Sequence, residues 1–142
     1  MSLLERIMEH EGFRPRPYQC PNGVWTIGHG LTYLTKEESE HIVKGRIIKL
    51  MLHLRDRHND WLTRHYTDEG QEILLGVMIE MCFQMGIRGF HRFVNTIAYL
   101  KKGQPAEAAV EMLDSFWARS DSPSRARELS DIVMGVEDHL RG

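Results

Sequence analysis

Glu11, Cys20 and Thr26 lie close together in a segment rich in glycine and proline, HEGFRPRPYQCPNGVWTIGHGLT. A glutamate at the end of a helix lies beside the negative end of the helix dipole, and partial burial would further favour its protonated form. A protonated carboxyl group can act as a general acid, and the thiolate of a cysteine is a strong nucleophile. Taken singly, the three residues also have ordinary alternatives, namely a solvated glutamate, a buried cysteine and a threonine in a strand.

The residues around this segment predict a helix followed by a small hairpin. Apolar residues recur at helical spacing between Leu3 and Met8, and Gly12 stands where a left-handed C-terminal cap is expected. The helix is therefore expected to end at Glu11. Further on, VWTIG follows the turn-forming PNG and has the composition of a short strand.

Two longer helices are expected next. Thr35 and Glu38 have the spacing of a capping box at the start of an amphipathic helix, which is expected to run to about residue 58. A second helix begins near Thr67 and contains the run EILLGVMIEMCFQMG. A helix that is apolar on nearly all sides is buried, so this run is the predicted core. Its methionines at helical spacing are expected to fill that core: Met78, Met81 and Met85.

Three shorter helical segments follow, separated by Gly103, Pro105 and Pro123. The sequence therefore predicts an α+β fold, predominantly α-helical, in a single domain over residues 1–142. The expected parts are a small β lobe over about 13–34, a connecting helix over about 35–58, and a helical lobe over about 67–142 plus 1–12. Such a two-lobed arrangement has a cleft, and Glu11 is expected on its floor.

The composition excludes several classes of protein. With 27% charged residues and a formal net charge of −2, the chain lacks the concentrated positive charge of a dedicated nucleic-acid binder. Cys20 and Cys82 do not stand at metal-ligand spacing and cannot form a disulfide framework, which favours a reducing compartment. Because Glu5 and Arg6 occur near the start and no window approaches membrane-spanning length, we expect neither a signal peptide nor stable membrane insertion.

The pattern around Glu11 resembles that of the phage-type lysozymes of the T-even phage kind, glycoside hydrolase family 24. That family has a Glu, eight residues, an Asp or Cys, five residues and a Thr, and Glu11, Cys20 and Thr26 stand at these spacings. Later stretches resemble the C-terminal lobe of the family: MCFQMG, FVNTIAYL, AEAAVEML and FWARSDSPSRA. The resemblance covers nearly the whole chain except residues 50–70, which show only generic helix and linker.

The resemblance implies hydrolysis of the β-1,4 bond between N-acetylmuramic acid and N-acetylglucosamine in peptidoglycan, without a metal or other cofactor. Glu11 would protonate the leaving oxygen, while Cys20 and Thr26 face the anomeric carbon and Thr26 helps to hold a water. Arg125 matches an arginine that approaches the catalytic glutamate in the family. Other residues match positions that line the family's sugar-binding cleft: Thr32, Phe83, Gln84, Asn95 and Thr96.

The chain also departs from the family. His29 precedes the second glycine of IGHG, whereas many relatives place the histidine after it, so the structural ion pair of that residue is not expected here. The stretch after the hairpin is short, which predicts a reduced hairpin and a more open cleft. Glu111 replaces a neutral residue of the cleft. Attraction to an anionic wall is therefore expected to depend on local positive charges: Arg14, Arg16 and Arg119.

These expectations describe a phage or prophage endolysin, a monomer that stays in the host cytoplasm until a holin or similar pore releases it to the periplasm and cell wall. Its partner would be the glycan strands of peptidoglycan. Two alternatives stay open, namely a lytic transglycosylase that uses Glu11 alone and a non-catalytic peptidoglycan-binding relative. The role of Cys20 also stays open: it could be a nucleophile that forms a thioglycosyl intermediate, a general base, for which a protonated thiol is poorly suited, or a spectator that shapes the site.

Overall fold

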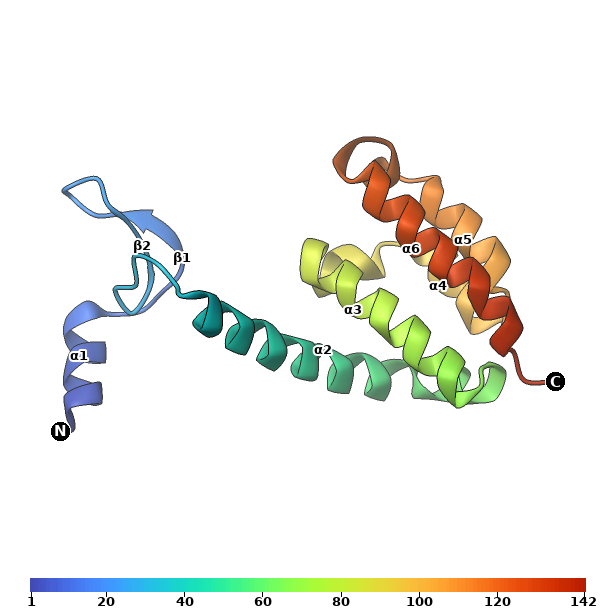
Figure 1. Ribbon diagram of the computed structural model, residues 1–142, viewed down its shortest axis with the longest axis horizontal. Helices are drawn as coiled ribbons and strands as arrows, with labels where there is room; N and C mark the ends of the chain where they lie inside the picture. Colours follow the sequence, from blue (N-terminus) through green and yellow to red (C-terminus); the bar gives the residue numbers. More distant parts are fainter. The chain divides into compact units, whose positions relative to one another are not determined.

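The computed structural model describes residues 1–142 and consists mostly of α-helices with one two-stranded antiparallel sheet (Figure 1). This composition confirms the predicted α+β, predominantly helical fold class. The chain divides into two compact units, Met1–Lys44 and Gly45–Gly142. The long helix α2 (Lys36–His65) contributes residues to both units.

The N-terminal unit begins with α1 (Leu3–Glu11), which a capping box starts. The backbone N–H of Glu5 donates to Oγ of Ser2 at 3.1 Å, and the N–H of Ser2 donates to the Glu5 carboxylate at 2.8 Å. The predicted end of the helix at Glu11 is confirmed. Gly12 has the expected positive φ of 69°, but its ψ of 175° lies outside the left-handed helical region.

The predicted hairpin is present and consists of β1 (Arg14–Gln19) and β2 (Trp25–Gly28). Between the strands, the N–H of Gly23 donates to the carbonyl of Cys20 at 2.8 Å, and Gly23 adopts a φ of 85° that few other residues tolerate. The pairing is irregular between Arg14 and Tyr18, and Tyr18 lies opposite Thr26. This pairing positions the polar side chains of the hairpin that are described below.

Helix α2 begins as predicted and ends later than predicted. The N–H of Thr35 donates to the Glu38 carboxylate at 3.0 Å, and the N–H of Glu38 donates to Oγ1 of Thr35 at 3.1 Å, so the capping box is formed. The helix continues to His65 rather than to about residue 58. Trp61 and Leu62 are buried and extend its apolar face, and the sequence has no glycine or proline there to stop it.

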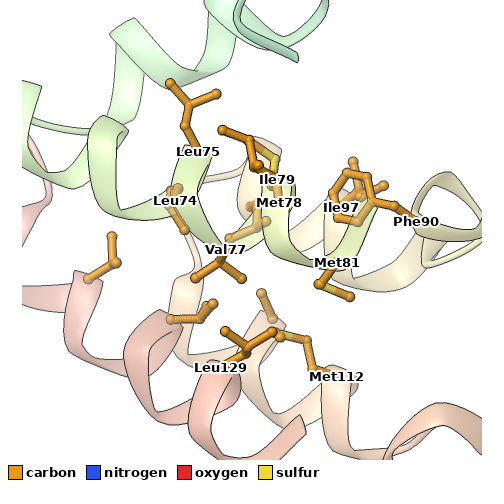
Figure 2. Close-up of a cluster of buried hydrophobic side chains, with 14 of the residues drawn as sticks. Leu74, Leu75, Val77, Met78, Ile79, Met81, Phe90, Ile97, Met112 and Leu129 are labelled. Atoms are coloured by element: carbon orange, nitrogen blue, oxygen red, sulfur yellow. The ribbon is translucent and has the colours of Figure 1, made fainter. Parts of the chain in front are cut away.

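Helix α3 (Asp68–His91) supplies the core of the C-terminal unit (Figure 2). The side chain of Thr67 caps it by accepting from the N–H of Gly70, and Gly86 interrupts it with a φ of 81°. The expectation that no segment reaches membrane-spanning length is wrong for α3, which by length and composition is long and apolar enough to span a membrane. Its apolar side chains are nevertheless packed in the core, which explains the composition without a membrane.

The rest of the C-terminal unit consists of α4 (Val94–Lys101), α5 (Pro105–Leu113), a π-helical turn (Trp117–Asp121), α6 (Pro123–Gly135) and a 3₁₀ turn (Val136–His139). Helices α5 and α6 lie side by side (Figure 1). The three predicted segments are thus divided more finely than expected. Met78 and Met81 are buried as predicted, and Met85 is partly buried against the same core.

A chain of hydrogen bonds links α2 to α3 through two histidines. Nε1 of Trp61 donates to Nδ1 of His58 at 3.1 Å, and Nε2 of His58 lies 3.0 Å from Nε2 of His91. Because an indole can only donate, His58 donates through Nε2, and His91 donates through Nδ1 to the carbonyl of Ile87 at 2.8 Å. Both rings are therefore neutral, and burial first and the neighbouring His91 second lower the pKa of His58 to about 4.

We expect the free energy of unfolding to fall as the pH is lowered from 6.5 to about 4. His58 of the unfolded chain binds a proton in this range and His58 of the folded chain does not, so acid favours the unfolded state. The loss at the lower end is about 3 kcal/mol, at about 1.4 kcal/mol for each pH unit.

Urea unfolding at a series of pH values measures this dependence. The variant His58→Gln should show a flatter profile, whereas His53→Gln, which changes an exposed histidine of the same helix, should keep that of the parent. Equal slopes for His58→Gln and the parent would contradict the assignment to His58.

Candidate active site

The carboxyl group of Glu11 lies against the backbone of Gly30, in the loop that follows β2. A Cβ atom on Gly30 would overlap Oε2 of Glu11 and lie 2.7 Å from its Cδ. The φ of Gly30 is 76°, which also favours glycine. Because Gly30 has no side chain, the Glu11 carboxyl group can occupy the space that a Cβ atom would otherwise fill. Within the N-terminal unit Glu11 is exposed, and the partial burial expected from the sequence is not found there.

Cys20 and Thr26 form a polar pair on the hairpin. Sγ of Cys20 lies 3.1 Å from Oγ1 of Thr26, and Thr26 is buried with 4% of its surface exposed. The hydroxyl of Thr26 also lies 3.4 Å from the carbonyl of Val24, which can accept from it. Since the hydroxyl carries one hydrogen, it can donate to Val24 while the thiol donates to Thr26, or it can donate to a Cys20 thiolate.

Tyr18 joins this pair and was not among the residues predicted for the site. It lies opposite Thr26 in the hairpin and two residues before Cys20, so strand alternation places all three side chains on one face. Desolvation first and the neighbouring Cys20 second raise the pKa of Tyr18 above its usual range, although the positive charge of Arg14 over its ring opposes the shift. Only the pairing of the two strands places Tyr18 opposite Thr26, so the sequence alone could not identify Tyr18.

The remaining predicted residue of this unit is Thr32, which is exposed. It directly follows a bridge in which Ile27 and Leu31 exchange two backbone hydrogen bonds of 2.9 Å. His29, in the turn between them, packs against Phe13 with ring centroids 5.2 Å apart. The bridge between Ile27 and Leu31 and the contact of His29 with Phe13 therefore fix the loop that contains Gly30.

In the C-terminal unit, the amide of Gln84 is fixed by three partners. Nε1 of Trp117 donates to its Oε1 at 3.1 Å and Nη1 of Arg125 donates to the same oxygen at 3.2 Å, while its Nε2 donates to Oγ of Ser122. One N–H of the exposed amide stays available for a ligand. Arg125 also forms an ion pair of 3.7 Å with Glu80.

The other predicted binding residues lie in two different pockets of this unit. Asn95 and Thr96 line a pocket of about 190 Å³ together with Glu111, the acidic residue that departs from the family pattern. Phe83 is 45% exposed and lines a pocket of about 250 Å³ beside the buried Cys82. Burial raises the pKa of the Cys82 thiol to about 11, so Cys82 is an inert core residue at neutral pH.

The predicted residues therefore form two groups. Glu11, Cys20, Thr26 and Thr32 belong to the N-terminal unit, whereas Phe83, Gln84, Asn95, Thr96 and Arg125 belong to the C-terminal unit. No group of three or more His, Cys, Asp or Glu side chains is arranged to hold a metal ion.

The family model described as phage lysozyme matches residues 8–129 of the chain. This range contains every residue named above for the two groups. No curated protein matches the sequence. The match covers far more than half of the 142 residues. The chain therefore belongs to the phage lysozyme family, the lysozyme-type endolysins that act on peptidoglycan.

Proposed function

We propose that this endolysin hydrolyses the β-1,4 bond between N-acetylmuramic acid and N-acetylglucosamine, with Glu11 as the general acid. The observation that carries the proposal is the placement of the Glu11 carboxyl group against Gly30, in the same unit as the pair of Cys20 and Thr26. The family match supplies peptidoglycan as the substrate.

In the first step, the Glu11 carboxyl group gives its proton to the glycosidic oxygen as the bond to the anomeric carbon breaks. The thiolate of Cys20 attacks that carbon and forms a thioglycosyl intermediate. A hydrogen bond from the Thr26 hydroxyl to the sulfur, as their separation of 3.1 Å permits, stabilises the thiolate.

In the second step, a water attacks the anomeric carbon, and the Glu11 carboxylate takes a proton from that water. The C–S bond breaks and the Cys20 thiolate forms again. Two displacements at the same carbon retain its configuration, whereas direct attack by a water held by Thr26 would invert it.

Sugar binding is assigned to polar and aromatic side chains, considered in each unit by itself. Thr32, Asn95 and Thr96 offer hydroxyl and amide groups, Gln84 offers its free N–H, and Phe83 offers an apolar ring face. The role of Arg125 would be to position Gln84, whose carbonyl oxygen accepts its hydrogen bond. In the cell, the protein would act as a monomer in lysis of the host, passing from the cytoplasm through a holin-type pore to the periplasm.

Replacement of Glu11 by glutamine tests the general acid. Glu11→Gln keeps the volume of the side chain and loses the proton donor, so the rate should fall about 10²–10⁴-fold while the circular dichroism spectrum is unchanged. The rate is measured by release of soluble products from purified peptidoglycan. Glu9→Gln, which changes an exposed glutamate of the same helix, is the matched control and should act at the parental rate.

Mass spectrometry of the same products identifies the reaction. Reducing muramic acid ends indicate hydrolysis, whereas anhydromuramic ends would indicate a lytic transglycosylase and contradict the proposed reaction. Parental activity in folded Glu11→Gln would contradict the assignment of the acid.

Replacement of Gly30 by alanine tests the placement of that acid. The new methyl group would displace the Glu11 carboxyl group, and a displacement of about 1 Å costs about 10²-fold in rate. The stability loss should be modest, about 1 kcal/mol from the positive φ, because a flexible exposed side chain can move away.

Gly23→Ala is the matched control for backbone strain. Gly23 has a φ of 85°, but a Cβ atom there would contact nothing within 4 Å. This variant should lose similar stability and keep most of its activity. Equal activity losses in the two variants, measured on peptidoglycan at a temperature where both are folded, would contradict the role of Gly30.

Two substitutions of Cys20, by serine and by aspartate, and alkylation of its thiol test the role of this residue. Cys20→Ser should lose most activity, because a serine hydroxyl ionises far less readily than a thiol, and Cys20→Asp should keep much of it. Iodoacetamide should inactivate the parent by modifying Cys20, and Cys82→Ala, which leaves Cys20 as the single thiol, should be inactivated equally fast. Full activity of folded Cys20→Ser would exclude the thiol from the mechanism and favour a water held by Thr26.

A further inference from the structure

A cavity of about 550 Å³ opens in the C-terminal unit between α2, the end of α3 and α4. Its lining includes three cationic side chains, Arg57, Arg64 and Lys101, and one carboxylate, Asp60. The chain as a whole carries a formal net charge of −2, so this local excess of positive charge stands out against the rest of the sequence. None of these residues belongs to the groups assigned above.

Two of the three cations have no carboxylate partner. Arg64 forms an ion pair of 2.8 Å with Asp60, whereas neither Arg57 nor Lys101 has an acidic group within 4.0 Å. A guanidinium and an ammonium group on opposite helices at one cavity therefore remain available for an anionic ligand.

The positive charges of Arg57 and Lys101 also affect the two histidines that line the cavity. His58 and His91 line it, and the positive charges of Arg57 and Lys101 contribute, after burial, to lowering the pKa of both histidines. All ring nitrogens of the pair are used in the chain from Trp61 to Ile87. The histidines thus form a neutral, aromatic wall, and the cations at the cavity provide the attraction for an anion.

We propose that this cavity binds the carboxylate groups of the peptide stems of peptidoglycan. This inference rests on the proposed function for its substrate. Peptide stems carry several carboxylates, and the planar fork of an arginine matches a carboxylate with two hydrogen bonds. A volume of about 550 Å³ lies within the range of about 300–1,000 Å³ for small-ligand sites, so a short peptide fits. A stripped strand carries one carboxylate on each lactyl group, close to the sugar ring, whereas the carboxylates of a stem lie along a flexible peptide that can enter the cavity. The site therefore distinguishes stem-bearing strands from stripped ones.

Titration with the free stem tripeptide, L-Ala-γ-D-Glu-diaminopimelate, tests the site directly. Calorimetry gives the Kd, and the indole N–H signal of Trp61 in NMR spectra reports binding at this cavity. Arg57→Gln and Lys101→Gln should each raise the Kd about threefold to tenfold, and the double variant should raise it further. Arg127→Gln, which removes an exposed arginine of α6 outside the cavity, should bind like the parent.

Three outcomes would overturn the proposal: no binding at millimolar tripeptide, an unchanged Kd in the double variant, or equal binding of inorganic phosphate at matched ionic strength. The tripeptide contains no glycosidic bond, so this result does not depend on hydrolysis. Glu11→Gln should bind it with the parental Kd, which separates a failure of this site from a failure of the proposed reaction.

A second measurement links the site to the substrate. The double variant Arg57→Gln/Lys101→Gln should cleave intact peptidoglycan with a higher KM and an unchanged kcat, and it should cleave glycan strands stripped of their stems like the parent. Equal KM values on intact peptidoglycan would overturn the role of the cavity in substrate binding.

Discussion

Burial of α3 is the constraint on which the C-terminal unit depends. This helix is apolar on most of its sides and shares one hydrophobic core with buried side chains of α2, α4, α5 and α6. Figure 2 shows Ile97 of α4, Met112 of α5 and Leu129 of α6 near its apolar side chains. The same packing fixes the polar groups at its end, because His91 meets His58 and Gln84 meets Trp117 only when α3 is in place. The residues proposed to bind sugar on the surface of this unit are thus supported by the hydrophobic core beneath them.

The N-terminal unit is organised on a different principle. Its elements are held by caps, turns and paired strands, and the position of Glu11 depends on the missing side chain of Gly30. Backbone geometry therefore places the acid, and side-chain packing has little part in it. The pair of Cys20 and Thr26 is set in the same way, by the register of the hairpin.

Local signals in the sequence predicted the parts of the fold that depend on neighbouring residues. Gly12 marks the end of α1, PNG marks the hairpin turn, and the spacing of Thr35 and Glu38 marks the start of α2. The predicted end of α2 near residue 58 was wrong because no glycine or proline marks the true end at His65. The burial of Trp61 and Leu62 extends the helix beyond residue 58.

Contacts between distant residues could not be predicted from the sequence. Gly30 contacts Glu11 only after the hairpin folds back towards α1, and His58 and His91 are 33 positions apart. The indole of Trp117, in the π-helical turn, donates a hydrogen bond to Gln84. No local sequence pattern predicts either the turn or this bond. The family pattern predicts Glu11, Cys20 and Thr26 as a site because it records such distant relations as spacings. It does not include Tyr18, whose place opposite Thr26 depends on strand register.

Contacts within the N-terminal unit itself bury only Thr26 among its 44 residues. A segment with so little buried apolar surface opens by local fluctuation at a much lower free energy than a packed core does. Amide protons of the hairpin are therefore expected to exchange with solvent long before those of α3. The contacts inside this unit therefore protect the side chains assigned to the reaction less than the hydrophobic core protects those of the C-terminal unit.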